Sequence, residues 1–434
     1  MSRPELNRLS AVEAAALIAR REITAEMLAR ACLARVAARE EEVRAWAYVD
    51  ADKVLAQARA LDAGPVRGPL HGVPVGIKDI IDTAAMPTGY GSAIYSGNQP
   101  AWDAACVSAI HAAGGIIMGK TVTSELATSY RGKTANPHNP AHTPGGSSSG
   151  SAASVADFMV PLALGTQTGG STIRPSSFCG VVGYKPSFGL INRQGVKPVS
   201  ETLDTVGVIA RSVPDVALLA TAITGRSGLD ELACEDPPRI GIWRTYEWEQ
   251  AAPETAAALD AAASRLEAAG APVRMAAMHE LFAELAGAHK EIQSFEMAQA
   301  LAYEMRLHQS RLSSTLKEGI AYGMQCTPET YDRKRAVADQ CRRLIDDVFA
   351  DFDILLAPSA PGEAPRGLEE TGSPVFNRGW TLLRLPCVTV PAFKGPRGLP
   401  VGVQVVGRFW RDAHTLACAH WVHRNLSLPA AGGS

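Results

Sequence analysis

The sequence lacks the features that mark a secreted or membrane-bound protein. Its eight cysteines are scattered over 434 residues with no C-x-x-C pair and no dense cluster, so they do not read as a disulfide framework. No apolar run approaches the roughly 18 residues of a membrane-spanning helix, and the first residues contain no uninterrupted apolar stretch like that of a signal peptide. We therefore expect reduced thiols, a cytoplasmic location and no contact with a membrane.

An excess of charge of one sign is also missing. The chain has 42 lysines and arginines, 44 aspartates and glutamates, a formal net charge of −2 and a pI of about 6.6. There is thus no overall field that would recruit nucleic acid, and we expect no nucleic-acid partner. The apolar fraction of 46% and the charged fraction of 20% are typical of a soluble globular protein.

What the sequence does contain is a run rich in glycine and serine at residues 143–186. Two Gly-Gly-Ser triplets, at 145–147 and 169–171, flank an apolar segment. That segment predicts a short helix near 152–155 and a buried strand at 160–164, which would bring the two triplets together. Because glycine leaves neighbouring backbone N–H groups accessible, we interpret the run as an active site.

Helical and strand-like segments alternate along the rest of the chain, which favours an α/β fold. Residues 10–60 are expected to be largely helical, and Ser10 and Glu13 have the spacing of a capping box at the first helix. Residues 70–81 are strand-like. The stretch 225–238, which is punctuated by glycine and proline, is the expected internal boundary.

Two familiar motifs occur in the central region, but neither has suitable surroundings. Residues 114–121 match the phosphate-binding G-x-x-x-x-G-K-[ST], yet the middle of the match is strand-like where a loop is needed. Residues 146–150 match G-x-S-x-G, the nucleophile elbow of α/β-hydrolases with Ser148 as nucleophile, yet no buried strand directly precedes them. A nucleotide-binding protein that uses Gly114 to Thr121 is the alternative from a different class.

A third arrangement uses three separate places in the chain. A serine hydroxyl is a weak nucleophile that needs a base, and a lysine is such a base when burial lowers its pKa. Lys78 lies in an apolar stretch that would desolvate it. Ser171 would be the nucleophile, and the hydroxyl of Ser147 would relay the proton. The loop that carries Ser171 would form an oxyanion hole with its backbone N–H groups. Its residues are Thr168, Gly169, Gly170 and Ser171.

On these residues the sequence resembles the amidase signature family, which includes fatty acid amide hydrolase, malonamidase and the glutaminase subunit of the aminoacyl-tRNA amidotransferases. The similarity runs from residues 70–79, through both triplets, to residues 398–404. The resemblance implies a triad with Ser171 as nucleophile, Ser147 as the bridging serine in a cis peptide and Lys78 as general base. The 24-residue separation of the two serines is the family's usual spacing.

The resemblance also implies the fold. We expect a single large α/β domain over residues 1–434, with a central mixed, twisted sheet surrounded by helices, and neither a cofactor nor a metal ion. Residues 1–65 would be an N-terminal helical segment and 66–225 the catalytic core. Residues 226–434 would complete the sheet, with a helical region at 280–350.

One departure from the family pattern bears on the substrate. Many members have an aspartate four residues before the nucleophile and an arginine two residues after it, whereas here Gln167 takes the first place and the arginine is Arg174, three residues after. Without its usual acidic partner, Arg174 is free to hold a carboxylate bidentately, an arrangement that resembles malonamidase. The alternative is that Arg174 pairs with another acid such as Asp204 or supports the loop. We name Arg174 and Gln167 as candidate substrate-binding residues.

The sequence therefore predicts an amidohydrolase that cleaves the C–N bond of a small carboxamide through an acyl-serine intermediate. Its partner would be a small-molecule amide, and a homodimer is left open. The alternative within the family is the glutaminase subunit of a tRNA-dependent amidotransferase, which shares the chemistry but needs another protein chain as its partner.

Overall fold

A computed structural model describes residues 5–128 and 132–427 of the chain. Its centre is one mixed sheet of eleven strands, in the order β1-β3-β2-β4-β6-β5-β10-β11-β9-β7-β8. The strands are β1 (Trp46–Tyr48), β2 (Pro74–Lys78), β3 (Ile116–Thr121), β4 (Leu162–Gln167), β5 (Val182–Lys185), β6 (Thr205–Ala210), β7 (Ile240–Ile242), β8 (Val273–Met275), β9 (Ile354–Pro358), β10 (Cys387–Lys394) and β11 (Pro400–Val406).

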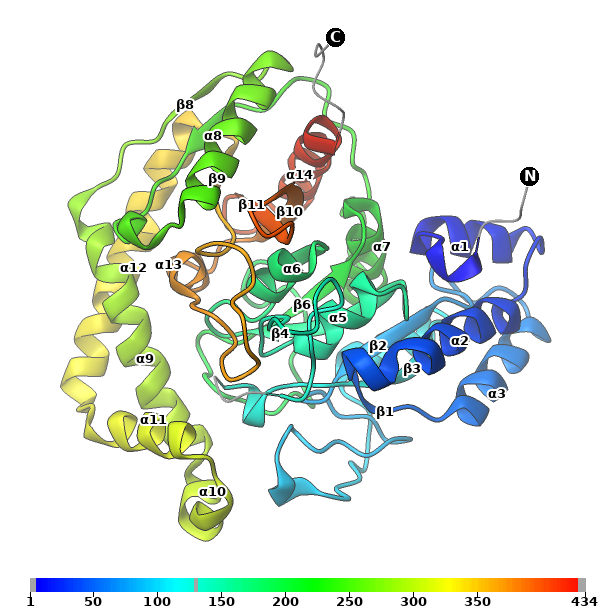
Figure 1. Ribbon diagram of the computed structural model, residues 1–434. Helices are drawn as coiled ribbons and strands as arrows, with labels where there is room; N and C mark the ends of the chain where they lie inside the picture. Colours follow the sequence, from blue (N-terminus) through cyan, green and yellow to red (C-terminus); the bar gives the residue numbers. More distant parts are fainter. Residues whose placement is uncertain (1–4, 129–131, 428–434) are drawn as a thin grey trace.

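Helices surround this sheet, so the expected fold class is confirmed. In Figure 1, α1 to α3 lie on one side of the molecule and α8 to α12 on the opposite side, with α5 and α6 between them. The α-helices are α1 (Ala11–Ala19), α2 (Ala25–Val43), α3 (Ala51–Asp62), α4 (Ala105–Ala112), α5 (Ser149–Ala156), α6 (Ile173–Cys179), α7 (Val213–Thr224), α8 (Pro253–Ala268), α9 (Leu285–Ala300), α10 (Ala302–Leu307), α11 (Ser314–Gln325), α12 (Pro328–Asp351), α13 (Val375–Leu382) and α14 (Asp412–Ser427).

Local sequence signals set the helix starts at the N-terminal end. The Ser10 side chain accepts a hydrogen bond from the Glu13 N–H while the Glu13 carboxylate accepts from the Ser10 N–H, so the capping box is confirmed. Thr24 caps α2 by accepting from the Met27 N–H. None of the helices in the described part of the chain is both long and apolar enough to cross a membrane.

The sheet places the two triplets beside Lys78. Strands β2 and β4 are parallel neighbours, with Ile77 opposite Leu164, so their carboxyl ends lie at one edge of the sheet. Lys78 is the last residue of β2, and the triplet at 169–171 follows the end of β4. The triplet at 145–147 precedes α5. A Cβ on Gly145 would lie 2.8 Å from the Cα of Pro175 in α6, so only glycine permits this approach of the two loops.

The alternative nucleotide-binding motif is wrong for a structural reason. Residues 116–121 of the match form the fully buried strand β3 instead of an open phosphate-binding loop. The ammonium of Lys120 is buried as well. It donates to the Ile81 carbonyl at 2.5 Å and to the Thr88 hydroxyl at 2.6 Å, and it lies 3.5 Å from the Asp79 carboxylate. This lysine therefore ties buried segments together and is not offered to a phosphate.

The loop at 225–238, expected as an internal boundary, does not divide the sheet. It leads into β7, which pairs in parallel with β9 in the same sheet, with Ile240 opposite Ile354. The chain on both sides of this loop thus contributes strands to one layer.

Candidate active site

Lys78 is a buried lysine held by hydroxyl groups. Its side chain has no exposed surface, and its Nζ lies 2.7 Å from both the Ser147 Oγ and the Thr166 Oγ1. Burial holds the pKa of Lys78 well below its ordinary value; the Asp204 carboxylate opposes this shift and the Arg174 guanidinium adds to it. A lysine that loses its proton readily and contacts a serine is suited to act as a base.

Ser147 lies in the position expected of a bridging residue. The peptide bond between Gly146 and Ser147 is cis, as the resemblance implied. The Ser147 hydroxyl is buried, and while it accepts a hydrogen bond from Lys78 Nζ it keeps its own O–H and one lone pair for other partners. When Lys78 is neutral, the same contact can carry the proton of Ser147 to the lysine.

Ser171 differs from the other two residues because its side chain is partly exposed. Its carbonyl accepts a hydrogen bond from the Ser148 N–H at 3.3 Å, which joins the two triplets through the backbone. The Ser171 hydroxyl makes no hydrogen bond with any residue that the structure describes, so the second step of the relay, from Ser171 to Ser147, stays a prediction.

The loop before Ser171 has its carbonyl groups occupied and its N–H groups free. The Thr168 carbonyl accepts from the His289 Nε2 at 2.8 Å, and the Gly169 carbonyl accepts from the Thr381 hydroxyl at 3.0 Å. Within residues 5–128 and 132–427, no group accepts a hydrogen bond from the N–H of Gly169, Gly170 or Ser171. Free N–H groups beside a nucleophile are what an oxyanion hole requires.

Thr168 is also fixed through its side chain. Its hydroxyl donates to the buried Asp204 carboxylate at 2.5 Å. Asp204 in turn accepts from the N–H groups of Val199 at 2.8 Å and Ser200 at 3.0 Å. Asp204 therefore anchors the loop on one side while His289 anchors it on the other.

Gln167, which was named as a candidate substrate-binding residue, makes all its side-chain hydrogen bonds within the protein. It is fully buried; its Oε1 accepts from the N–H groups of Thr172 at 3.0 Å and Ile173 at 3.1 Å, and its Nε2 donates to the Thr381 hydroxyl at 3.0 Å. Both ends of the carboxamide are thus bonded within the protein. These contacts do not support a substrate-binding role for Gln167; they give it the role of holding the loop that carries Ser171.

Arg174 is buried and has no acidic partner in the described residues, Asp204 included. Its Nε donates to the Thr371 carbonyl at 2.7 Å, and its Nη2 donates to the Gly146 carbonyl at 2.5 Å and to the Thr371 hydroxyl at 3.1 Å. Only Nη1 is left without a partner. Arg174 thus supports the loop with two of its nitrogens, which was one of the two alternatives, and the binding of a carboxylate by Arg174 stays a prediction.

The nucleophile-elbow interpretation of Ser148 is also wrong. Its side chain is fully buried. Its hydroxyl donates to the Thr166 carbonyl at 3.2 Å and accepts from the Thr166 N–H at 3.2 Å. Ser148 thus joins the first triplet to β4.

Residues that no motif indicated complete the surroundings of the loop. Lys78 is contacted by Thr166 of β4. The loop before Ser171 is contacted by Asp204, by His289 of α9 and by Thr381 of α13. The sequence contained no signal for Thr166, His289 or Thr381, and it indicated Asp204 only as an alternative partner of Arg174. Arg378 is a further arginine near Arg174, and its positive charge helps lower the pKa of Arg174 to about 9, after burial as the larger cause.

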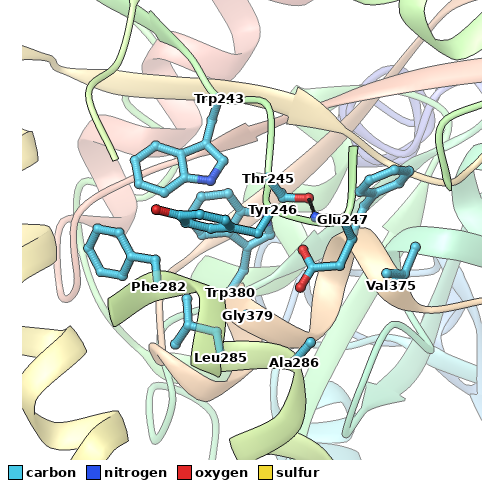
Figure 2. A pocket seen from close by; sticks show the side chains of 11 residues that line it. Trp243, Thr245, Tyr246, Glu247, Phe282, Leu285, Ala286, Val375, Gly379 and Trp380 are labelled. Atoms are coloured by element: carbon cyan, nitrogen blue, oxygen red, sulfur yellow. Dashed lines mark hydrogen bonds between the residues drawn. The ribbon is translucent and has the colours of Figure 1, made fainter. Parts of the chain in front are cut away.

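An aromatic pocket is lined by residues of α13, of α9 and of the segment that follows β7. Figure 2 shows the rings of Trp243, Tyr246 and Phe282 gathered at one side of it, with Glu247 near Val375. The cavity has a volume of about 30 Å³, the space of one or two water molecules. The free space between these side chains is thus small.

Comparisons with known proteins identify the family of this chain. A family model described as Amidase matches residues 27–416. The A-type chain of glutamyl-tRNA(Gln) amidotransferase from Anaeromyxobacter sp. (strain K) is 35% identical over 99% of each chain. Among solved structures, the native peptide amidase from Stenotrophomonas maltophilia aligns with a TM-score of 0.81 at 29% identity, over 96% of this chain and 97% of the other.

A second solved structure, 6-aminohexanoate cyclic dimer hydrolase complexed with substrate, aligns with a TM-score of 0.86 at 25% identity over 98% of each chain. The neighbours share the fold along nearly their whole length, and they include enzymes that act on amides. The chain therefore belongs to the amidase signature family, and it is an amide-hydrolysing enzyme.

Proposed function

We propose that the protein hydrolyses the C–N bond of a small carboxamide through an acyl intermediate on Ser171. The observation that carries this proposal is the contact of 2.7 Å between the Nζ of a fully buried Lys78 and the Oγ of Ser147, in the triplet that is bonded through its backbone to that of Ser171. A base, a relay hydroxyl and a nucleophile are then available in sequence.

The steps follow from these groups. Neutral Lys78 takes the proton of Ser147, Ser147 takes the proton of Ser171, and the Ser171 Oγ attacks the amide carbonyl carbon. The N–H groups of Gly169, Gly170 and Ser171 stabilise the oxyanion. The proton returns by the same path to the leaving nitrogen, the C–N bond breaks, and ammonia or an amine departs. Water then attacks the acyl-serine with the same relay and releases the carboxylic acid.

The substrate in this proposal carries a carboxylate. Arg174 is buried near the loop without an acidic partner among the described residues, and its Nη1 is free. A buried guanidinium gains from an anion that binds it, because the ion pair offsets the loss of hydration. This is the feature in which the sequence resembles malonamidase.

The second candidate is the glutaminase component of a tRNA-dependent amidotransferase, and the sequence comparison favours it. The curated relatives at 32–35% identity are A-type chains of glutamyl-tRNA(Gln) amidotransferase that align over 98–99% of this chain. The position of Arg174 and the presence of Gln167 depart from the usual family pattern, and this departure counts against the glutaminase candidate. Robust amide hydrolysis by the purified chain alone would favour the first candidate, and activity that appears only with partner proteins would favour the second.

The main test is Ser171→Ala, assayed for ammonia release on a panel of malonamate-like, aliphatic and aromatic primary amides. Loss of the nucleophile is expected to lower kcat by about 10³-fold or more. Ser149→Ala is the matched control, because Ser149 lies in the same region and, among the described residues, its hydroxyl bonds only to the Val122 carbonyl. Wild-type activity in Ser171→Ala would contradict the proposal.

A further inference from the structure

We infer that Arg174, Arg378, Asn377 and His289 form a subsite for a substrate group that carries both a carboxylate and an N–H donor. This inference rests on the proposed function and defines its substrate class more narrowly. Each of the four residues has a polar side-chain atom that is buried and makes no hydrogen bond with a described residue. These atoms are Arg174 Nη1, Arg378 Nε, Asn377 Oδ1 and His289 Nδ1.

The four side chains meet at the two glycines before Ser171. A Cβ on Gly170 would lie 2.5 Å from Asn377 Oδ1 and 3.1 Å from Arg174 Nη1. A Cβ on Gly169 would lie 3.6 Å from His289 Cε1 and 3.9 Å from Arg378 Cγ. The four side chains that carry the unpartnered atoms thus lie beside one pair of glycines, and they come from α6, α9 and α13.

The two arginines supply positive charge that the protein does not balance. No carboxylate of a described residue lies within 4.0 Å of either guanidinium. Their charges lie close enough that Arg378 lowers the pKa of Arg174, and Glu247 is the acid that acts on Arg378 in the opposite sense. Two neighbouring guanidinium groups, largely removed from water, favour an anion between them.

The other two residues supply acceptors whose direction is fixed by their remaining bonds. His289 Nε2 lies 2.8 Å from the Thr168 carbonyl, so Nε2 carries the ring proton and Nδ1 is an acceptor. The ring stays neutral, because burial and Arg378 lower its pKa to about 3. Asn377 Nδ2 donates to the Ser359 carbonyl at 3.1 Å, which leaves Oδ1 as the acceptor.

The two arginine donors and the two acceptors together define the ligand that would fit them. A carboxylate alone would satisfy the arginines but leave both acceptors without a donor, which is costly in a buried site. A group with a carboxylate and an ammonium or amide N–H would satisfy both kinds of atom. Because Gly170 and Ser171 are adjacent, about 3.8 Å apart between Cα atoms, the carboxylate and the scissile carbonyl would be joined by a short chain.

The experiment measures binding first, by calorimetry on Ser171→Ala protein, so that the result does not depend on turnover. The probes form two matched series: asparagine, succinamate and butyramide, and the longer glutamine, glutaramate and valeramide. In at least one series we expect the amino-acid amide to bind more tightly than the amide with a carboxylate alone, and the neutral amide to bind most weakly. Equal affinity for neutral and charged amides, or no binding of any charged probe, would overturn the inference.

Arg378→Met is expected to weaken binding of the carboxylate-bearing amides by about 10- to 100-fold and to leave the neutral amide unchanged. Arg378→Lys should recover part of the loss, whereas a merely structural arginine would affect all probes alike. The exposed Arg408→Met is the matched control. Equal losses on neutral and charged amides would overturn the inference.

Turnover by the wild-type chain separates this inference from the proposed function. If the charged amides bind but Ser171-dependent hydrolysis is absent, the proposed function fails and the subsite stands. If hydrolysis depends on Ser171 but neutral amides are preferred, the acyl-serine mechanism of the proposed function stands, whereas its carboxylate-bearing substrate and the subsite both fail.

Discussion

The two Gly-Gly-Ser triplets have the same residues and opposite environments. The serine of the first triplet, Ser147, is buried, follows a cis peptide bond and contacts the Nζ of Lys78. The serine of the second, Ser171, is partly exposed, and its hydroxyl makes no hydrogen bond with any described residue. The surroundings of the two triplets, rather than their composition, separate a proton relay from a nucleophile.

The glycines of the two triplets differ in the same way. Gly145 has a φ of +80° and allows the first loop to approach α6, whereas Gly169 and Gly170 make room for side chains from α9 and α13. In the first triplet glycine thus serves the packing of two loops. In the second it lies beside N–H groups and polar side-chain atoms that have no hydrogen-bond partner among the described residues.

The largest effect that tests this contrast is expected from Ser147→Ala. The change removes the hydroxyl between Lys78 and Ser171, so the base can no longer reach the nucleophile, and kcat/KM should fall by about 10²- to 10⁴-fold. Steady-state ammonia release measures the effect, and thermal unfolding checks that the fold persists. A Ser147→Ala enzyme as active as Ser149→Ala would show that Ser147 is not a relay.

A smaller effect is expected on pH dependence from Asp204→Asn. Lys78 must be neutral to act as base, so activity should rise with pH through the lowered pKa of Lys78. The Asp204 carboxylate raises that pKa, and its removal should move the acid limb of kcat/KM to lower pH. Asp215→Asn, at another buried aspartate, is the control. An unchanged acid limb with lowered activity would give Asp204 only its structural contacts with Thr168.

The smallest effect is expected on the pH dependence of stability from His289→Asn. The pKa of His289 falls from its ordinary 6.5 to about 3 in the folded protein, so the unfolded chain binds the proton first. Stability should therefore be lost as pH falls from about 6.5 toward 3. The fall in unfolding midpoint between pH 7 and pH 4 should be smaller in His289→Asn than in wild type or His308→Asn. An identical fall in all three would contradict a buried neutral His289.

Much of this molecule was predictable because its signals are local. The capping box at Ser10, the strand that ends at Lys78 and the helix and strand between the triplets each depend on a few neighbouring residues. The contact of Lys78 with Ser147 was predicted from the hydroxyl that a lysine base would need. The roles of the triad and of the oxyanion loop stay predictions that the experiments above test.

The residues whose contacts were not predicted share one property, which is that some of their partners lie far away along the chain. Gln167 was named as a candidate substrate-binding residue and Arg174 as free to hold a carboxylate, yet partners of both side chains, Thr381 for Gln167 and Thr371 for Arg174, lie about 200 residues away in the chain. The binding of a carboxylate by the remaining Nη1 of Arg174 stays a proposal. Arg378 and His289 had no motif at all. A polar residue far along the chain gives no signal of where the fold will place it.

The sequence by itself determined the chemical groups: two serines among glycines and one lysine in an apolar stretch. Only the tertiary structure decided their states. Burial at the end of β2 lowers the pKa of Lys78, and neighbouring strands bring it to Ser147. The packing of α6, α9 and α13 then leaves four polar atoms without partners among the described residues beside Ser171. Desolvation and long-range contacts depend on the whole fold, whereas residue types and short-range spacing can be read along the chain.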